Sequence, residues 1–413
     1  MRKAVAVDLR PVASDARVIA EERGSRRVAW RDAAVIWLAQ HVSLILIIYI
    51  GKTTILAQLA PSPNTGTISW ASLFQHWDGW DGSLYAIIAQ RGYHGLATAA
   101  FPPLLPAIER AFWVGASVRP ALAGLIVANI AELGAFGLFH RLVERESDLA
   151  TARRALIYLA IFPTAFYLAL PYTESLFLLL SIGVFLAVRG RRWMVAGALV
   201  ALATLTRQTG ILLCIPLLVE YWRDRRDRRD RRAEPAGAMP RDLGRFALAL
   251  SLPVLTTLAW YVYLYHQFGT FAATSRAEQQ DWGRGLAIPV IGFARAGNAL
   301  LQRGTDPNVF QMHILLDGAF TLLFVGLVVA MWRRLPARYS LYCAALLLVV
   351  VSLPAHNWLA LSSNMRYMLG AFPIFMLLGR WGQRERIDRV IWFCSLPLLA
   401  LFTLIFFLAG WVA

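Results

Sequence analysis

Residues 390–412 have the sequence VIWFCSLPLLALFTLIFFLAGWV, 23 residues without a charged side chain. A block of this kind fits the hydrocarbon core of a bilayer, which a helix of roughly 17–25 apolar residues can cross. Further apolar blocks lie at 33–50, 155–170, 176–188, 246–265, 315–331 and 341–353. The sequence therefore predicts an all-α polytopic integral membrane protein.

The composition excludes other classes of protein. Of the 413 residues, 58% are hydrophobic and 16% are charged, and the mean hydropathy is +0.53. Soluble domains carry about 25% charged residues, so neither a disordered chain nor an ordinary soluble enzyme fits. Cys214, Cys343 and Cys394 stand apart in apolar segments, which indicates neither a disulfide framework nor a metal-ligand cluster.

The basic residues indicate the orientation of the chain. The net charge is +16, and the arginines are concentrated in short segments between apolar blocks. This placement is typical of cytoplasmic loops and argues against a nucleic-acid partner. With a cytoplasmic N-terminus and about 11 membrane helices, 31 of the 41 Lys and Arg residues fall on the cytoplasmic side and 10 on the external side. Arginine-rich, lysine-poor usage favours a high-GC genome and hence a bacterial cell (inner) membrane.

The predicted organisation is one multi-pass membrane domain in contact with the lipid bilayer. Its N-terminal tail is too charged and polar for a cleavable signal peptide, so the first apolar block is expected to be a retained helix. The stretch 97–118 is either a re-entrant pair or an interfacial helix. The expected parts are a basic cytoplasmic tail at 1–32, the membrane domain at 33–413, external loops at 51–119 and 267–308, and a basic cytoplasmic loop at 223–243.

The first external loop contains the sequence HWDGWDGSLY at 76–85. Asp78 and Asp81 each follow a tryptophan, and a carboxylate held among tryptophans at a membrane interface is partly desolvated. Partial desolvation favours proton uptake, the property that a general base needs. The alternative is an interfacial aromatic belt with solvated aspartates.

Other polar residues are expected at external helix ends, where they could converge on one cavity. Ionisable groups in membrane segments are costly and tend to be functional. Each also has a structural alternative: Glu174 as a charge at a helix start, Arg207 as a counter-ion, and Arg366 as a side chain that snorkels to the interface. His356 and Asn357 could belong to a plain loop.

Several short motifs resemble those of the GPI mannosyltransferase II (PIG-V) family of the GT-C glycosyltransferase superfamily. They occur in order on one predicted membrane side, although Leu84 stands where the family has a second aromatic residue, and the duplicated Trp-Asp leaves two aspartates to align. The matching segments are WDGSLYAIIAQRGY at 80–93, FPPLLP at 101–106, FPTAFY at 162–167, PYTESLF at 171–177, LTRQTG at 205–210, RYML at 366–369 and FP at 372–373.

The resemblance implies a GT-C-like bundle with external interfacial helices and a definite reaction. A single sugar, mannose in the family, would pass from a polyprenyl-phosphate donor to an acceptor hydroxyl with inversion at the external face. The acceptor would be a glycolipid, a glycan or a protein. The implied site consists of Asp81, or alternatively Asp78, as catalytic base, Arg207 and Arg366 for the donor phosphate, and Tyr85, Tyr172, Glu174, His356, Asn357 and Tyr367 for substrate.

Two other functions and a metal remain open at the level of sequence. A lipid or solute transporter or flippase would place polar sites near the bilayer midplane, often in internal repeats, and the chain has no convincing long repeat. A lipid-linked-oligosaccharide ligase would share the use of arginine for phosphate. No cofactor is expected: Asp78 and Asp81 could ligate a divalent ion together with substrate phosphate, but metal independence is favoured because no all-protein cage is visible.

Overall fold

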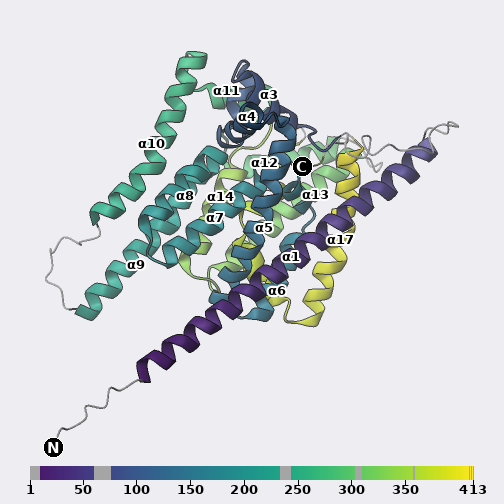
Figure 1. Cartoon of the computed structure of the whole chain (residues 1–413). Helices are drawn as coiled ribbons and strands as arrows, with labels where there is room; N and C mark the ends of the chain where they lie inside the picture. The colour runs from purple at the N-terminus through teal and green to yellow at the C-terminus, as the bar shows by residue number, and fades with distance from the viewer. Residues whose placement is uncertain are drawn as a thin grey trace, which may run out of the picture.

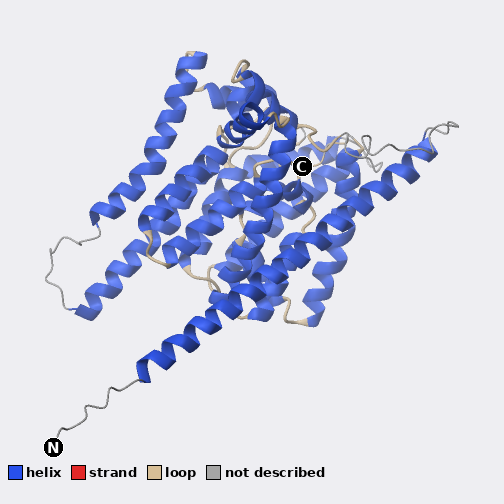
Figure 2. Cartoon of the chain, in the orientation of Figure 1, coloured by secondary structure: helices blue, strands red, loops and turns tan. Residues whose placement is uncertain are grey.

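The computed structural model describes residues 10–59, 76–232, 243–302, 309–356, 359–408, 410 and 412. Within these ranges the regular secondary structure is helical, and the only extended pairing is an isolated bridge between Arg284 and Ala355 (Figure 2). The all-α prediction is therefore confirmed for the described part of the chain.

Five of the described helices are long and apolar enough to cross a membrane. Their apolar side chains cannot all be buried inside the protein, as exposed Val35, Leu258 and Phe393 illustrate. Surfaces of this kind suit lipid, so the chain has the character of an all-α membrane protein. The five helices are α1 (Arg10–Leu59), α5 (Pro120–Glu146), α10 (Leu243–Phe268), α13 (Val309–Met331) and α17 (Glu385–Phe407).

Shorter helices fill the space between and above these five (Figure 1). Those within the bundle are α6 (Leu149–Ala160), α7 (Glu174–Arg189), α8 (Trp193–Thr206), α9 (Cys214–Arg232), α14 (Ala337–Val351), α15 (Asn364–Gly370) and α16 (Pro373–Trp381). The two predicted external loops contain α3 (Asp81–Arg91), the 3₁₀ helix η1 (Leu96–Ala100), α4 (Leu104–Ala116), α11 (Ala273–Asp281) and α12 (Pro289–Gln302).

Proline divides one expected helix and separates two short helices elsewhere in the chain. The apolar block at 155–170 was predicted as one helix, but α6 ends at Ala160, and after Pro163 the chain forms only the 3₁₀ helix η2 (Ala165–Ala169). Similarly, Pro373 separates α15 from α16. Proline lacks an N–H and disfavours helical geometry in the residue before it, so the chain turns at both positions.

Charged segments continue two of the helices beyond the expected apolar blocks. The predicted junction at residue 32 lies inside α1, which begins at Arg10. The described start of the predicted basic loop, 223–232, is the last part of α9. Its alternating Arg and Asp residues place opposite charges four positions apart, as in the pair between Arg228 and Asp224 at 2.9 Å, which supports a helix.

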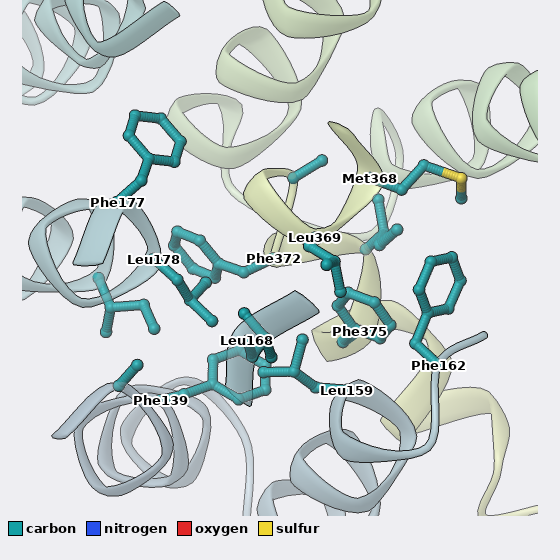
Figure 3. Packing of buried hydrophobic residues seen from close by; sticks show 14 of the residues in the cluster. Phe139, Leu159, Phe162, Leu168, Phe177, Leu178, Met368, Leu369, Phe372 and Phe375 are labelled. Atoms are coloured by element: carbon teal, nitrogen blue, oxygen red, sulfur yellow. The ribbon is translucent and has the colours of Figure 1, made fainter. Parts of the chain in front are cut away.

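The core is formed by α5, α6, α7 and α16 around a set of aromatic side chains (Figure 3). Phe162 contacts Phe375 edge to face with ring centroids 5.3 Å apart, and Phe139 contacts Phe372 at 5.8 Å. Large rings packed in this way are hard to displace. The core therefore fixes the start of α7 and the adjacent helix α15 relative to each other.

The end of the bundle opposite the start of α7 is held by a buried ion cluster. Arg338 of α14 donates to Glu146 at the end of α5 and to Glu220 of α9, each at 2.8 Å. Only 6% of the Arg338 side chain is exposed. Helices α8 and α14 both run from this end toward the start of α7. The charged residues of this cluster are therefore separate from those at the start of α7.

Candidate functional site

A cavity of about 260 Å³ opens where α3, α11 and α15 meet the ends of α8 and α14. These elements come from four distant parts of the sequence, since α15 directly follows α14, and α3 and α11 lie together at the upper end of the bundle in Figure 1. The polar side chains that line the cavity are Asp81, Tyr85, Thr173, Thr206, Arg207, Gln208, Thr209, Glu278, Arg284, Ser363, Arg366 and Tyr367.

Asp81 is the first residue of α3, and the turn before it is strained. Trp80 has φ 53°, a left-handed conformation that is costly for a residue with a Cβ. The strained turn is packed against the segment before α7: Tyr172 donates to the Gly79 carbonyl at 2.8 Å, and a Cβ on Gly82 would lie 3.3 Å from the Tyr172 ring. The small residue Gly82 therefore allows Asp81 to approach the cavity.

Asp81, Glu174, Arg207 and Arg366 form one buried charge network. Arg366 donates from Nη1 to Asp81 Oδ2 at 2.7 Å and from Nε to Glu174 Oε1. Arg207 donates from Nη1 to the same Glu174 oxygen at 2.6 Å. The exposed fractions of the four side chains range from 3% to 18%. Two cations and two anions balance, as low-dielectric surroundings require.

Aromatic rings hold the two arginines of this network in place. The Arg366 guanidinium lies 4.7 Å from the centre of the Tyr167 ring and 4.8 Å from that of Tyr172. The Arg207 guanidinium lies 5.2 Å from the Tyr367 ring. Ring faces attract cations at these distances, so both guanidinium groups are fixed before any ligand arrives.

Arg284, which the sequence analysis did not select, is the third arginine in the cavity. It follows α11, after Gly283 turns the chain with φ 63°. Its Nη1 donates to the Tyr367 hydroxyl at 2.8 Å and its Nη2 to the Ser362 carbonyl at 3.2 Å. Within the described ranges, no carboxylate oxygen lies within 4 Å of the guanidinium nitrogens of Arg284. Arg207 and Arg366 each have a carboxylate oxygen within that distance. Its positive charge therefore remains available to a ligand.

Glu278 adds a second carboxylate to the cavity wall. Its side chain makes no hydrogen bond within the described part of the chain. Burial raises the pKa of Glu278 above its ordinary value and Asp81 adds to this effect, whereas the charges of Arg284 and Arg207 oppose it. Glu278 is therefore easier to protonate than a solvated glutamate.

The remainder of the wall is apolar. Phe101 contacts the Tyr85 ring at 5.1 Å and the Trp282 ring at 5.6 Å, both edge to face. The other apolar residues of the wall are Ala100, Pro102, Ile211, Leu212, Val349, Val350 and Leu353. A cavity with one charged wall and one apolar wall suits an amphipathic ligand.

The structure brings together half of the residues that the sequence analysis selected. Asp81, Tyr85, Arg207, Arg366 and Tyr367 line the cavity.

The other selected residues lie behind the cavity or outside it. Tyr172 and Glu174 are buried behind its wall and contact the arginines. His356 instead pairs with Gly283 through Nδ1, 2.6 Å from the carbonyl oxygen. Asp78 lies in the turn before α3 and does not line the cavity. Asn357 lies outside the described residues.

The donor set for a metal ion is sparse. The described residues contain no group of three or more His, Cys, Asp or Glu side chains close enough together to hold one. Asp81 directs one of its oxygens at Arg366.

Comparisons with known proteins provide no family for this chain. No protein-family model, no curated protein and no solved structure matches it.

Proposed function

We propose that this chain is a membrane glycosyltransferase that moves a single sugar from a polyprenyl-phosphate donor to an acceptor hydroxyl. One observation carries the proposal: the Asp81 carboxylate and the guanidinium group of Arg284 line the same cavity, which also has an apolar wall. A carboxylate can accept a proton, a guanidinium group can bind a phosphate, and the apolar wall can take the first units of a polyprenyl chain. Mannose as the sugar follows from the family resemblance.

The charges of the cavity favour a donor with one phosphate. Glu174 and Asp81 neutralise Arg207 and Arg366, which leaves Arg284 as the unpaired cation among the described lining residues. Glu278 and Asp317 act on Arg284 only through space, beyond ion-pair distance. A phosphodiester carries one negative charge and matches this single cation. A diphosphate-linked oligosaccharide, the donor of a ligase, would bring additional charge that has no partner.

In this proposal Asp81 acts as the general base. Its Oδ2 accepts from Arg366 at 2.7 Å, whereas its Oδ1 has no hydrogen-bond partner among the described residues. In the reaction, the acceptor oxygen attacks the anomeric carbon while its proton passes to Asp81. The bond between that carbon and the phosphate oxygen breaks, and the sugar is inverted.

The leaving group explains the need for arginine. A phosphodiester that loses its sugar becomes a polyprenyl phosphate monoester, which gains negative charge as the bond breaks. Arg284 and Arg207 line the cavity where this charge would develop. Preorganised donors stabilise such a transition state because they need no rearrangement during the reaction.

The proposal also includes the finer topology. It has about 11 crossings, a cytoplasmic N-terminus and the cavity at the external face of a bacterial cell membrane. The arrangement of charge supports this orientation: Arg145, Arg189, Arg338 and Arg380 gather at the end of the bundle opposite the cavity. This distribution is what the positive-inside rule predicts, because loops rich in arginine stay on the cytoplasmic side of the membrane.

Purified protein in nanodiscs provides the direct test. The substrates are radiolabelled polyprenyl-phosphate sugars, mannose first, offered with glycolipid, glycan and peptide acceptors. We expect release of polyprenyl phosphate together with label on one acceptor class, and loss of both signals in Asp81→Asn. The proposal would be contradicted if the protein bound none of these donors and released polyprenyl phosphate from none of them.

One observation favours the alternative of a lipid or solute transporter. His41 of α1 meets two polar residues of α5. Its Nε2 lies 2.6 Å from Asn129 Oδ1 and 3.6 Å from the buried carboxylate of Glu132. Ionisable groups inside membrane helices often belong to transport pathways. Lipid flipping in proteoliposomes that is lost in Glu132→Gln and retained in Asp81→Asn would favour the transporter.

A further inference from the structure

A second cavity, of about 230 Å³, lies at the opposite end of α8 from the candidate site. The helix begins here at Trp193 and ends at Thr206, which lines the first cavity. Its 14 residues span about 20 Å at 1.5 Å per residue. The two cavities therefore face opposite sides of the bundle. The second is lined by Arg191, Arg192, Trp193, Met194, Val195, Arg228 and Arg245.

The second cavity has a surplus of positive charge. Of its four arginines, Arg191 and Arg228 share the carboxylate of Asp224, which is 8% exposed. Arg192 and Arg245 have no carboxylate within 4 Å in the described ranges. The single shared anion fixes two of the guanidinium groups, and the other two are left to an anionic ligand.

The cavity also adjoins an apolar surface. Met194 and Val195 are 37% and 50% exposed, and Leu202 and Leu248 on the neighbouring faces of α8 and α10 are 40% and 54% exposed. Beneath them Trp193 packs edge to face against Phe246, with ring centroids 5.6 Å apart. Here charged groups at the end of the bundle lie beside apolar side chains that are exposed along its helices. Such a change from charged to apolar surface marks the level of the lipid headgroups.

We propose that this cavity binds the phosphate headgroup of an anionic phospholipid. Arg192 and Arg245 donate to the phosphate oxygens, Arg191 and Arg228 are held beside them by Asp224, and the acyl chains follow Met194 and Val195 along α8. Guanidinium groups bind phosphate through paired, charge-assisted hydrogen bonds. The proposal is independent of the glycosyltransferase function, because it concerns the other end of the bundle.

The test compares lipids on the full-length protein in detergent. Retention of dioleoylphosphatidylglycerol and of dioleoylphosphatidylcholine is measured by native mass spectrometry. We expect retention of the anionic lipid over the zwitterionic one, and a loss of that preference by roughly tenfold in Arg192→Gln/Arg245→Gln. Arg245→Gln alone is expected to show a smaller loss and is used if the double variant fails to fold.

A matched control removes the same charge elsewhere. Arg384 and Arg386 are exposed at the start of α17 and do not line the cavity, so Arg384→Gln/Arg386→Gln should retain the preference. An equal loss in this control, or no preference in the wild type, would overturn the proposal. Glycerol phosphate and inorganic phosphate are added as competitors: if they displace the lipid at equal concentration, the site binds a soluble phosphate and its assignment to lipid is wrong.

Discussion

Arg366 donates to Asp81 at 2.7 Å across 285 residues of sequence, and through Glu174 the same guanidinium group is linked to Arg207. The carboxylate proposed as the base and the neighbouring arginines thus form one unit. Any change to one member therefore changes the charge balance of the others.

We expect Asp81→Asn to reduce glycosyl transfer by about 10²–10⁴-fold, the usual contribution of a general base. Asparagine is close to aspartate in shape and retains an oxygen that can accept from Arg366, so the fold of the site should change little. Single-turnover transfer in nanodiscs measures the effect. Asp78→Asn is the control and should retain most of the activity, because Asp78 does not line the cavity. An inactive Asp78→Asn beside an active Asp81→Asn would reverse the assignment.

We expect Arg284→Gln to weaken donor binding by about tenfold to a hundredfold, the range that hydrogen bonds to charged groups provide. Lysine at this position should restore only part of the affinity, because it lacks the planar fork of donors. Equilibrium binding of the labelled donor measures both. Arg276→Gln is the matched control, since Arg276 is exposed on α11 and does not line the cavity. Equal affinity in Arg284→Gln and wild type would remove Arg284 from the phosphate site.

Arg207→Ala and Arg366→Ala should also weaken binding of the donor more than binding of the acceptor. Both guanidinium groups line the cavity, although each is already paired with a carboxylate. Their effect on donor KM should therefore be smaller than that of Arg284→Gln. An unchanged donor KM in both alanine variants would assign the two arginines to folding alone.

Glu174→Gln tests the structural side of the network. Glu174 is 3% exposed and accepts from two arginines, so loss of its charge leaves both guanidinium groups without their shared anion. Breaking a buried pair in this way destabilises a protein by about 3–5 kcal/mol. Glu385→Gln removes one partner of the exposed pair with Arg389 and should change the free energy of unfolding by less than about 1 kcal/mol. Chemical denaturation in detergent compares the two, and equal effects would contradict a buried network.

The residues that could be predicted from the sequence are those at helix ends next to recognisable motifs. Asp81, Arg207 and Arg366 each lie at or near the terminus of a helix, and the predicted alternation of the chain across the membrane puts those ends on one side. Their shared position around one cavity agrees with that prediction.

Arg284 and Glu278 could not be found in this way. They belong to the segment at 267–308, and their position in the cavity depends on α11 packing against η1 and on the bridge between Arg284 and Ala355. No local pattern encodes such long-range contacts. The division at Pro163 carried a visible signal, which the length of the apolar block at 155–170 outweighed in the prediction.

The proposed orientation predicts which cysteines react from outside the cell. In a background without Cys214, Cys343 and Cys394, Arg276→Cys should react with a membrane-impermeant maleimide added to intact cells, whereas Arg225→Cys should react only after the membrane is opened. Both positions are exposed, so access of the reagent depends on the side of the membrane. The opposite labelling pattern would place the candidate site in the cytoplasm and contradict the arginine-based topology.

Glu278 should make donor binding depend on pH. Burial raises the pKa of Glu278, so its proton is bound more tightly in the folded protein than in the unfolded chain, and its contribution to stability is lost as the pH rises through the folded pKa. A phosphate bound at Arg284 adds negative charge nearby and raises that pKa further, so donor binding is linked to proton uptake. Donor affinity should therefore fall as the pH increases through the pKa of Glu278.

Glu278→Gln, which is neutral at every pH, should show a flatter profile, whereas Gln279→Glu provides the control for a new carboxylate outside the cavity. An unchanged pH profile in Glu278→Gln would mean that a different group titrates when the donor binds.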